Sequence, residues 1–191
     1  MLVAGFTPGP NNLMLATSGV NFGLRRTLPH IIGVALGFPV LFFCIGAGLG
    51  NLFKTFPLLH IVLKIVGTVY MVWLAWKIAF APATKTRTAS KPLTFWQSAA
   101  FQWVNPKAWI MTIAAITLYT VAGDNYFWQL ALMTLLALTV SSTSASTWAV
   151  LGATIRHWMA HQPQALRIFN IIMGILLILS VVPILISGPI V

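Results

Sequence analysis

Acidic residues are almost absent from this sequence: Asp124 is the single one among 191 residues, and only 6% of the residues are charged. A typical soluble domain has about 25% charged residues. A soluble fold of this size could not cover its surface with so few charges, whereas 59% of the residues are hydrophobic. Lipid is the remaining solvent that fits, so the sequence predicts an all-α integral membrane protein.

Cysteine is equally scarce, since Cys44 is the only one. A single cysteine excludes an intramolecular disulfide and a cysteine cluster for zinc. His157 and His161 are spaced so that both fall on one helical face, but no cysteine or carboxylate accompanies them. We therefore expect no metal site and no cofactor.

A pairing of nucleophile and base is also missing. The run Ser141–Ser146 supplies hydroxyl groups, but nucleophilic catalysis needs an activating base within hydrogen-bond reach. His30 and His60 fall at expected membrane interfaces, and no histidine falls in the core of an expected span. We expect no enzyme, and we interpret these small residues, like Gly33 and Gly37, as places where helices approach closely.

Positive charge is what the sequence has in excess, with 11 Lys and Arg residues and a formal net charge of +10. Nucleic-acid-binding proteins gather such cations in a patch or stripe. Here the cations lie between long apolar runs, as they do in the cytoplasmic loops of membrane proteins. The expected partner is therefore a lipid bilayer and not a nucleic acid.

The apolar runs predict six transmembrane helices, because a span needs about 20 apolar residues. The first span lacks a basic segment before it, which argues against a cleavable signal peptide. Proline and polar residues interrupt the first and the fourth span. The expected bounds are Met1 to about Asn21, His30–Phe53, Leu58–Phe80, Phe95–Val121, Phe127–Ala149 and Ile168–Ile186.

The charges between the spans predict their orientation. The second loop has only Lys54, and the fourth has no cation, only Asp124. By the positive-inside rule, the odd loops are cytoplasmic and both termini face outside. The cations in or next to the odd loops are Arg25, Arg26, Lys77, Lys85, Arg87, Lys91, Arg156 and Arg167.

A linker at 81–93 divides this single transporter domain into halves at 1–80 and 94–191. Three spans in each half make the halves inverted relative to each other. One fixed offset in the sequence takes Pro10 to Pro106. The same offset takes Gly46, Gly48 and Gly50 to Ser142, Ser144 and Ser146. We expect two inverted three-helix repeats, each with a broken first helix and a second helix that ends in small residues. Chance is the alternative for any single match.

The first broken helix contains Thr7-Pro8-Gly9-Pro10-Asn11-Asn12. Two prolines and a glycine cannot continue a helix, so the backbone must open there. Open backbone at membrane depth is tolerated where it is buried in protein or lines a cavity. A helix that restarts at Pro10 would expose free N–H groups that suit a carboxylate. The alternative is a plain proline kink.

The second broken helix contains Asn105-Pro106-Lys107. Asn is a favoured N-cap and Pro is favoured at the first helical position, so the pair predicts a helix restart in mid-span. Lys107 lies about halfway along its span, where an ammonium needs partners or water. We expect it to hold a substrate carboxylate or to control a gate. The alternative is a lysine that caps carbonyls at the end of a broken half-helix.

With these motifs, the chain resembles the LysE/RhtB amino-acid exporters over nearly its whole length. The glycine pattern Gly19, Gly23, Gly33 and Gly37 also fits the family, and Val72–Ala79 and Lys91–Trp96 are similar to the cysteine and O-acetylserine exporter branch. The resemblance implies a multi-pass protein of the bacterial inner membrane that exports amino acids with proton-motive force. With Asn12, the family motifs give the expected substrate-binding residues: Pro8, Gly9, Pro10, Asn11, Asn12, Asn105, Pro106 and Lys107.

These observations together predict a secondary transporter with alternating access around the two broken helices. Because the membrane interior contains no Asp or Glu, we expect small neutral substrates such as cysteine, O-acetylserine, threonine and homoserine. The proton carrier stays open between Lys107, a histidine and the substrate itself, and so does a homo-oligomeric state. The alternative is a non-transporting scaffold or accessory protein, or an inactive truncated transporter, because the lead into Pro8 is short.

Overall fold

The computed structural model describes residues 1–49, 55, 57–81, 91–159, 162–182 and 186. Every regular element in these ranges is a helix. The elements are α1 (Leu2–Phe6), α2 (Pro10–Phe22), α3 (Leu24–Cys44), the π-helical turn η1 (Ile45–Leu49), α5 (Pro57–Ala79), α6 (Phe95–Val104), α7 (Pro106–Tyr119), α8 (Tyr126–Met159) and α9 (Pro163–Leu179).

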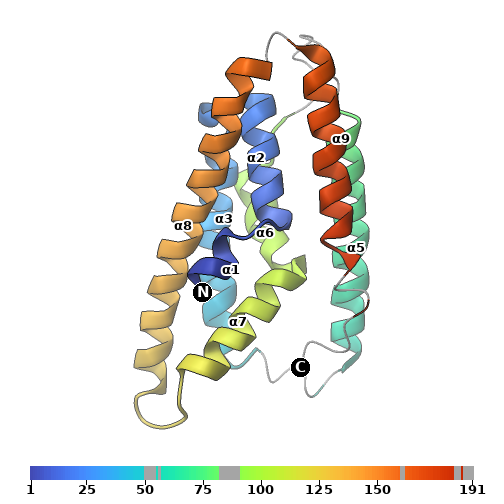
Figure 1. Cartoon of the computed structure of the whole chain (residues 1–191). Coiled ribbons are helices and arrows are strands. Elements are labelled where there is room, and N and C mark those ends of the chain that lie inside the picture. The colour runs from blue at the N-terminus through green and yellow to red at the C-terminus, as the bar shows by residue number, and fades with distance from the viewer. Residues whose placement is uncertain (50–54, 56, 82–90, 160–161, 183–185, 187–191) are drawn as a thin grey trace.

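The helices form an elongated bundle (Figure 1). The long α8 packs along α2 and α3, α3 also packs on α6, and α5 pairs with α9. The short α1 lies beside the middle of α8, at the level where α6 turns into α7 (Figure 1). Both interruptions of the helical backbone therefore fall inside the bundle and not at its ends.

The expected helix breaks at Pro8–Pro10 and Asn105 are confirmed. α1 ends at Phe6 and α2 begins with Pro10 at its first turn, with extended backbone at Thr7 and Gly9 between them. Asn105 is the N-cap of α7. A single proline does not end a helix in this protein, since α3 contains Pro29 and Pro39. The two breaks fall instead at Pro8-Gly9-Pro10, which combines two prolines with a glycine, and at Asn105-Pro106, where an N-cap residue precedes a proline that is favoured at a helix start.

Close contacts between backbones hold the centre of the bundle together. A Cβ added at Gly19 would clash with the Ala149 carbonyl oxygen of α8, and one at Gly152 would clash with that of Ala16 on α2. Gly33 faces the backbone of α6 in the same way. The role in close helix packing that the sequence predicts for Gly33 and Gly37 is confirmed, since Gly37 lies against Ala99 of α6 in the same way.

The outside of the bundle is more apolar than the surface of a soluble protein. Large apolar side chains are exposed along one face of α3 at a spacing of four residues, and others cover the outside of α5, α8 and α9. The core is also mainly apolar, but it contains buried polar side chains, among them Asn12, His30, Gln102 and Asn170. An apolar outside, with polar groups kept inside, is what a lipid environment selects. The exposed residues of α3 are Leu24, Leu28, Ile32, Leu36 and Val40.

The two longest apolar helices are long enough to cross a membrane by themselves. They are Leu24–Leu49 and Tyr126–Met159, and the shorter Pro163–Leu179 is also apolar. The broken helices are shorter because each is divided: α6 has 10 residues and α7 has 14.

The cations gather at one end of the bundle, which we call the cationic end. Gly23, at the turn between α2 and α3, lies against the guanidinium of Arg156 near the end of α8. The end of α8 and the beginning of α9 lie together at the top of Figure 1, whereas the connection from α7 to α8 lies at the bottom. Asp124, in that connection, is exposed. The side of the membrane that this end faces stays a prediction.

Several expected bounds and placements are wrong. α3 begins at Leu24 and not at His30, and α8 continues past Ala149 to Met159. Apolar runs mark the lipid-embedded part of a helix, and the helix can continue beyond that part. His30, expected at an interface, is 1% exposed.

The expected position of the small residues is wrong for the second half. Ser142–Ser146 lie in the middle of α8, because that helix extends far beyond them. Gly46 and Gly48 do lie at the end of the helix that follows the first break, where Gly48 has a φ of 126°. Gly50 and most of the 81–93 linker fall outside the described residues. The division into halves stays a prediction.

Candidate functional site

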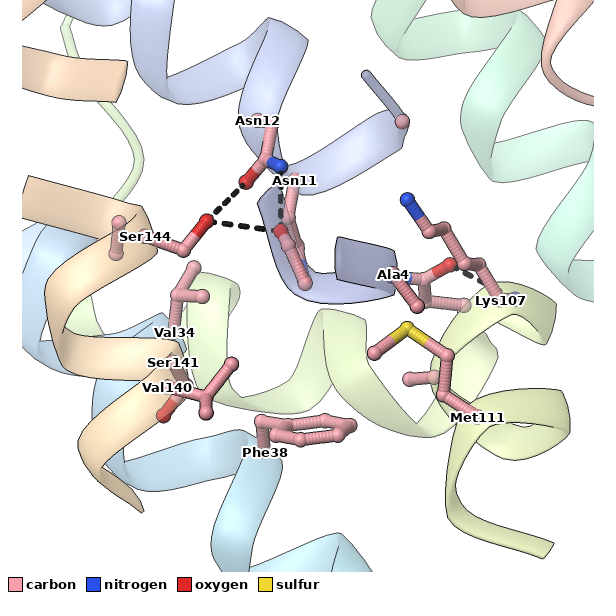
Figure 2. Close-up of a pocket in the computed structure, with 15 residues that line it drawn as sticks. Ala4, Asn11, Asn12, Val34, Phe38, Lys107, Met111, Val140, Ser141 and Ser144 are labelled. Atoms are coloured by element: carbon pink, nitrogen blue, oxygen red, sulfur yellow. Dashed lines mark hydrogen bonds between the residues drawn. The ribbon is translucent and has the colours of Figure 1, made fainter. Parts of the chain in front are cut away.

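A cavity of about 60 Å³ lies between the two helix breaks, and we call it the central cavity. A single water molecule needs about 10–15 Å³ of such space, so several waters or a small polar molecule fit. α1, α2, α3, α7 and α8 all contribute side chains to its wall (Figure 2). Phe38 and Met111 supply apolar surface, and amide, hydroxyl and ammonium groups supply polar surface.

Asn12 and Ser144 point toward each other on one side of the central cavity (Figure 2). The Ser144 hydroxyl is 3.2 Å from Asn12 Oδ1 and donates to the Gly5 carbonyl at 2.9 Å. Asn12 Nδ2 donates to the carbonyls of Gly5 and Thr7 at 2.8 and 2.9 Å. These two side chains therefore bind carbonyls at the end of α1, which no longer have partners within a helix.

Asn11 joins the two broken helices. Its Nδ2 donates to Gln102 Oε1 at 2.8 Å, and Gln102 Nε2 donates back to Asn11 Oδ1 at 3.1 Å. Gln102 is fully buried in the last turns of α6. Gln102 Nε2 also donates to the Ser98 carbonyl at 2.9 Å. The two side-chain amides stabilise each other, because their mutual hydrogen bonds satisfy polar atoms that apolar neighbours could not.

Lys107 reaches from the start of α7 to the end of α1. Its Nζ donates to Thr7 Oγ1 at 2.9 Å and to the Thr7 carbonyl at 3.1 Å. Gly9 makes room for this side chain, since a Cβ there would lie 2.8 Å from Lys107 Nζ. The ammonium thus caps the carbonyl of a broken half-helix, as one of the two sequence interpretations expected, and its side chain also lines the central cavity.

Asn105 fixes the position of Lys107. Its side-chain oxygen accepts from the Lys107 backbone N–H at 3.2 Å, and its carbonyl accepts from the N–H groups of Ala108 and Trp109 at 3.0 and 3.4 Å. The first N–H groups of α7 are therefore occupied by the protein. The start of α2 and the Lys107 ammonium are the positive groups left for an anion at the central cavity.

The eight predicted site residues divide into two groups in the structure. Gly9, Asn11, Asn12, Asn105 and Lys107 line the central cavity. Pro8, Pro10 and Pro106 set the breaks in the backbone around it and do not line it.

Sequence reasoning missed two residues of this site. Gln102 was part of the second motif but had no expected role, and Ser144 was interpreted as a packing residue. The signal that could have identified Gln102 is a glutamine placed just before an Asn-Pro break.

No metal site is present among the described residues, where no group of three metal-ligating side chains occurs. His157 is exposed, and His161 lies outside the described residues. The two histidines therefore have no third metal-ligating side chain beside them in the part of the chain that the structure describes.

Comparison with known proteins decides the family. A family model described as LysE type translocator matches residues 2–188. The chain belongs to the LysE type translocator family. Membership agrees with the resemblance carried by the two broken-helix motifs, and it makes the chain a membrane transport protein of the amino-acid export type and not an enzyme.

Curated relatives have one name in common. The chain is 31% identical to the cysteine/O-acetylserine efflux protein of Salmonella typhimurium (strain LT2) over 179 residues, which is 93% of this chain and 89% of the relative. It is 30% identical to the protein of that name from Escherichia coli (strain K12), with the same coverage. The resemblance to the cysteine and O-acetylserine branch is confirmed. No solved structure matches the chain.

Proposed function

We propose that this LysE type translocator is a secondary transporter that exports small neutral amino acids across the bacterial inner membrane. Cysteine, O-acetylserine, threonine and homoserine are the proposed substrates. The observation that carries this proposal is the position of Lys107, the one side chain among the described residues that brings a positive charge into the central cavity between the two helix breaks.

The charge of the central cavity favours a zwitterion with a neutral side chain. Lys107 and the start of α2 offer positive charge to a carboxylate. The only acidic residue, Asp124, lies in the exposed connection between α7 and α8. A second cationic group on the substrate would therefore have no counter-charge, and burying an unpaired charge is costly. This argument favours threonine or cysteine over lysine or arginine.

Substrate binding would exchange partners at Lys107. In the structure its ammonium is held by Thr7, whose carbonyl also accepts from Asn12. A substrate carboxylate would take over the ammonium, because a charged acceptor forms a stronger bond than a neutral one. The Thr7 carbonyl and hydroxyl would then be free to accept from the substrate ammonium. This exchange keeps every polar group paired and couples binding to the link between α1 and α7.

Six spans in two inverted halves are the architecture that we propose for transport. The broken pairs α1–α2 and α6–α7 would each count as one span, α3 would correspond to α8, and α5 to α9. Exchange of the halves then converts the contact of the first broken span with α8 into the contact of the second broken span with α3, and leaves α3–α8 and α5–α9 unchanged. The most extensive helix pairs among the described elements all fall within these contacts, which supports a two-fold relationship between whole spans. The halves differ in detail, because α8 packs on α2, after the first break, whereas α3 packs on α6, before the second.

Efflux from intact cells tests this function. Cells are loaded with labelled threonine or cysteine, and release is followed with and without the protein, whose presence in the membrane is checked. We expect faster release with the wild-type chain and release at the background rate with Lys107→Met, which keeps the length of the side chain. Lys64→Met, on α5 and outside the central cavity, is the matched control. Background release by the wild type would contradict the proposal.

A further inference from the structure

A second cavity, of about 100 Å³, lies toward the cationic end of the bundle, and we call it the inner cavity. None of the described residues that line it also lines the central cavity. Along α2 the wall passes from Asn11 and Asn12 at the central cavity to Thr17 and Asn21 at the inner one. The Asn11–Gln102 pair lies at the central-cavity end of this path, so the two spaces follow one another along the bundle.

The inner cavity is positive and contains no carboxylate. Lys77, near the end of α5, and Lys91, just before α6, both line it. Lys77 Nζ lies over the Trp73 ring at 4.5 Å from its centroid, which keeps the ammonium beside the cavity. The single acidic residue of the chain, Asp124, is in the connection between α7 and α8, at the other end of the bundle. Two cations without a counter-ion at the mouth of a cavity attract an anion.

His30 lies in the wall of the same cavity, and no group in the described part of the chain forms a hydrogen bond with its side chain. Its side chain is 1% exposed, and neither ring nitrogen has a hydrogen-bond partner there. Buried polar groups are nearly always paired, so an unpaired imidazole in a cavity wall is a group that a ligand or a water in the cavity would pair with. A neutral imidazole offers one N–H donor and one lone pair, and the lone pair accepts from an ammonium.

Oxygen atoms complete this polar wall. Thr17 and Ser18 are buried on α2, and Asn21 exchanges amide hydrogen bonds of 2.8 and 3.2 Å with Asn170 on α9. Thr17, Ser18 and Asn21 line the inner cavity together with His30. Cations at the mouth and acceptors deeper inside match the two charged ends of an amino acid.

We propose that the inner cavity is a second substrate site, at which an amino-acid zwitterion binds before it passes the Asn11–Gln102 pair to the central cavity. The carboxylate faces Lys77 and Lys91, and the ammonium faces the lone pair of His30 and the oxygens of α2. The identity of the ligand rests on the proposed export function. Binding at this site does not require Lys107, which belongs to the central cavity.

Protection of an introduced cysteine tests this site without requiring transport. The only native cysteine is removed by Cys44→Ala, and Leu74→Cys or Ile78→Cys places a thiol on α5 in the wall of the inner cavity. The full-length protein is exposed to a thiol reagent from the cationic end, with increasing threonine. We expect threonine to slow the modification. Lys77→Met or His30→Leu should raise the half-protecting concentration about tenfold, as expected for one lost hydrogen bond to a charged group.

Two further variants separate this site from its neighbours. Arg167→Met removes an exposed cation on α9 that does not line the inner cavity, and we expect unchanged protection. Lys107→Met should also leave protection in place. The proposal would be overturned if Lys107→Met abolished the protection while Lys77→Met left it unchanged. Binding at the central cavity, followed by closure of the inner cavity, would then explain the protection. The absence of protection in every variant would also overturn the proposal. If cells show no efflux while threonine still protects the thiol, the result would contradict the export function but not the binding site in the inner cavity.

Discussion

Asn11 on α2 and Gln102 on α6 exchange two amide hydrogen bonds, of 2.8 and 3.1 Å, across 91 positions of sequence. This pair connects the restart of the first broken helix to the end of the segment before the second break. It also borders the central cavity, which Asn11 lines. The two helix breaks are thus joined by side chains as well as by backbone packing.

The Asn11–Gln102 pair should show energetic coupling. Asn11→Leu takes from the fully buried Gln102 side chain its partner on α2, and Gln102 Oε1 is then left unsatisfied, which costs about 1–3 kcal/mol. Gln102→Leu takes from the half-buried Asn11 its partner on α6 and should cost less. The double variant removes both amides and should lose less than the sum of the single variants. Thermal unfolding of the purified protein in detergent measures this cycle. We expect a coupling of about 1 kcal/mol, the range found between membrane helices, and additive losses would contradict the link.

Gly9→Ala should disturb Lys107 and little else. The added methyl group would lie 2.8 Å from Lys107 Nζ and 2.9 Å from its Cδ, so the flexible side chain must move. We expect slower efflux of threonine with normal amounts of protein in the membrane. In a Lys107→Ala background the same change should leave the melting temperature as it is, because the atoms that it meets are gone. A fall in melting temperature in that background would show that Gly9 acts through the backbone.

Asn105→Ala should weaken the start of α7. The Asn105 side chain accepts from the Lys107 N–H at 3.2 Å, and loss of such a cap costs about 1 kcal/mol. Asn105→Ser can restore the cap with a shorter side chain, so it should recover most of the stability and of the efflux. Melting temperature and efflux are measured on both variants. Equal behaviour of Ala and Ser at this position would exclude capping as its role.

Gly152→Leu should destabilise the crossing between α2 and α8. A side chain there would meet the Ala16 carbonyl and Cα, which are backbone atoms and cannot move aside. Overpacking of this kind costs about 1–3 kcal/mol or more. Val150→Leu on the exposed face of the same helix is the control, since Val150 is 45% exposed. We expect a lower melting temperature for the first variant only, and similar values for both would contradict the close approach.

The sequence could predict features that depend on local chemistry. The clusters Pro8-Gly9-Pro10 and Asn105-Pro106 disfavour a continuous helix, so the breaks followed from the local sequence. Single prolines at 29 and 39 do not break α3, so it is the combination of residues that marks the breaks. The sequence also predicted that the cations of alternate loops lie together at one end of the bundle, because the bilayer imposes a charge bias on each loop separately. Gly33 was predicted to allow close packing for a similar reason, since it lacks a side chain.

The partners of the polar residues could not be predicted in the same way. Gln102 pairs with Asn11 only because α6 and α2 meet, and Ser144 reaches Asn12 only because α8 crosses α2 at that level. Such contacts depend on how helices distant in sequence pack. The ends of α3 and α8 were also misplaced, because hydrophobicity reports contact with lipid and not the hydrogen bonds that continue a helix. For that reason His30 was expected at a surface.

The central claim is that Lys107 holds the substrate carboxylate in the central cavity, and a second thiol-protection measurement tests it most directly. Met111→Cys in the Cys44→Ala background places a thiol in the wall of that cavity. Threonine should protect it, whereas threonine amide, which lacks the carboxylate, should need about a tenfold higher concentration or more. In Lys107→Met this difference should disappear. Equal protection by the two compounds in the wild-type background, or a difference that survives Lys107→Met, would contradict the account.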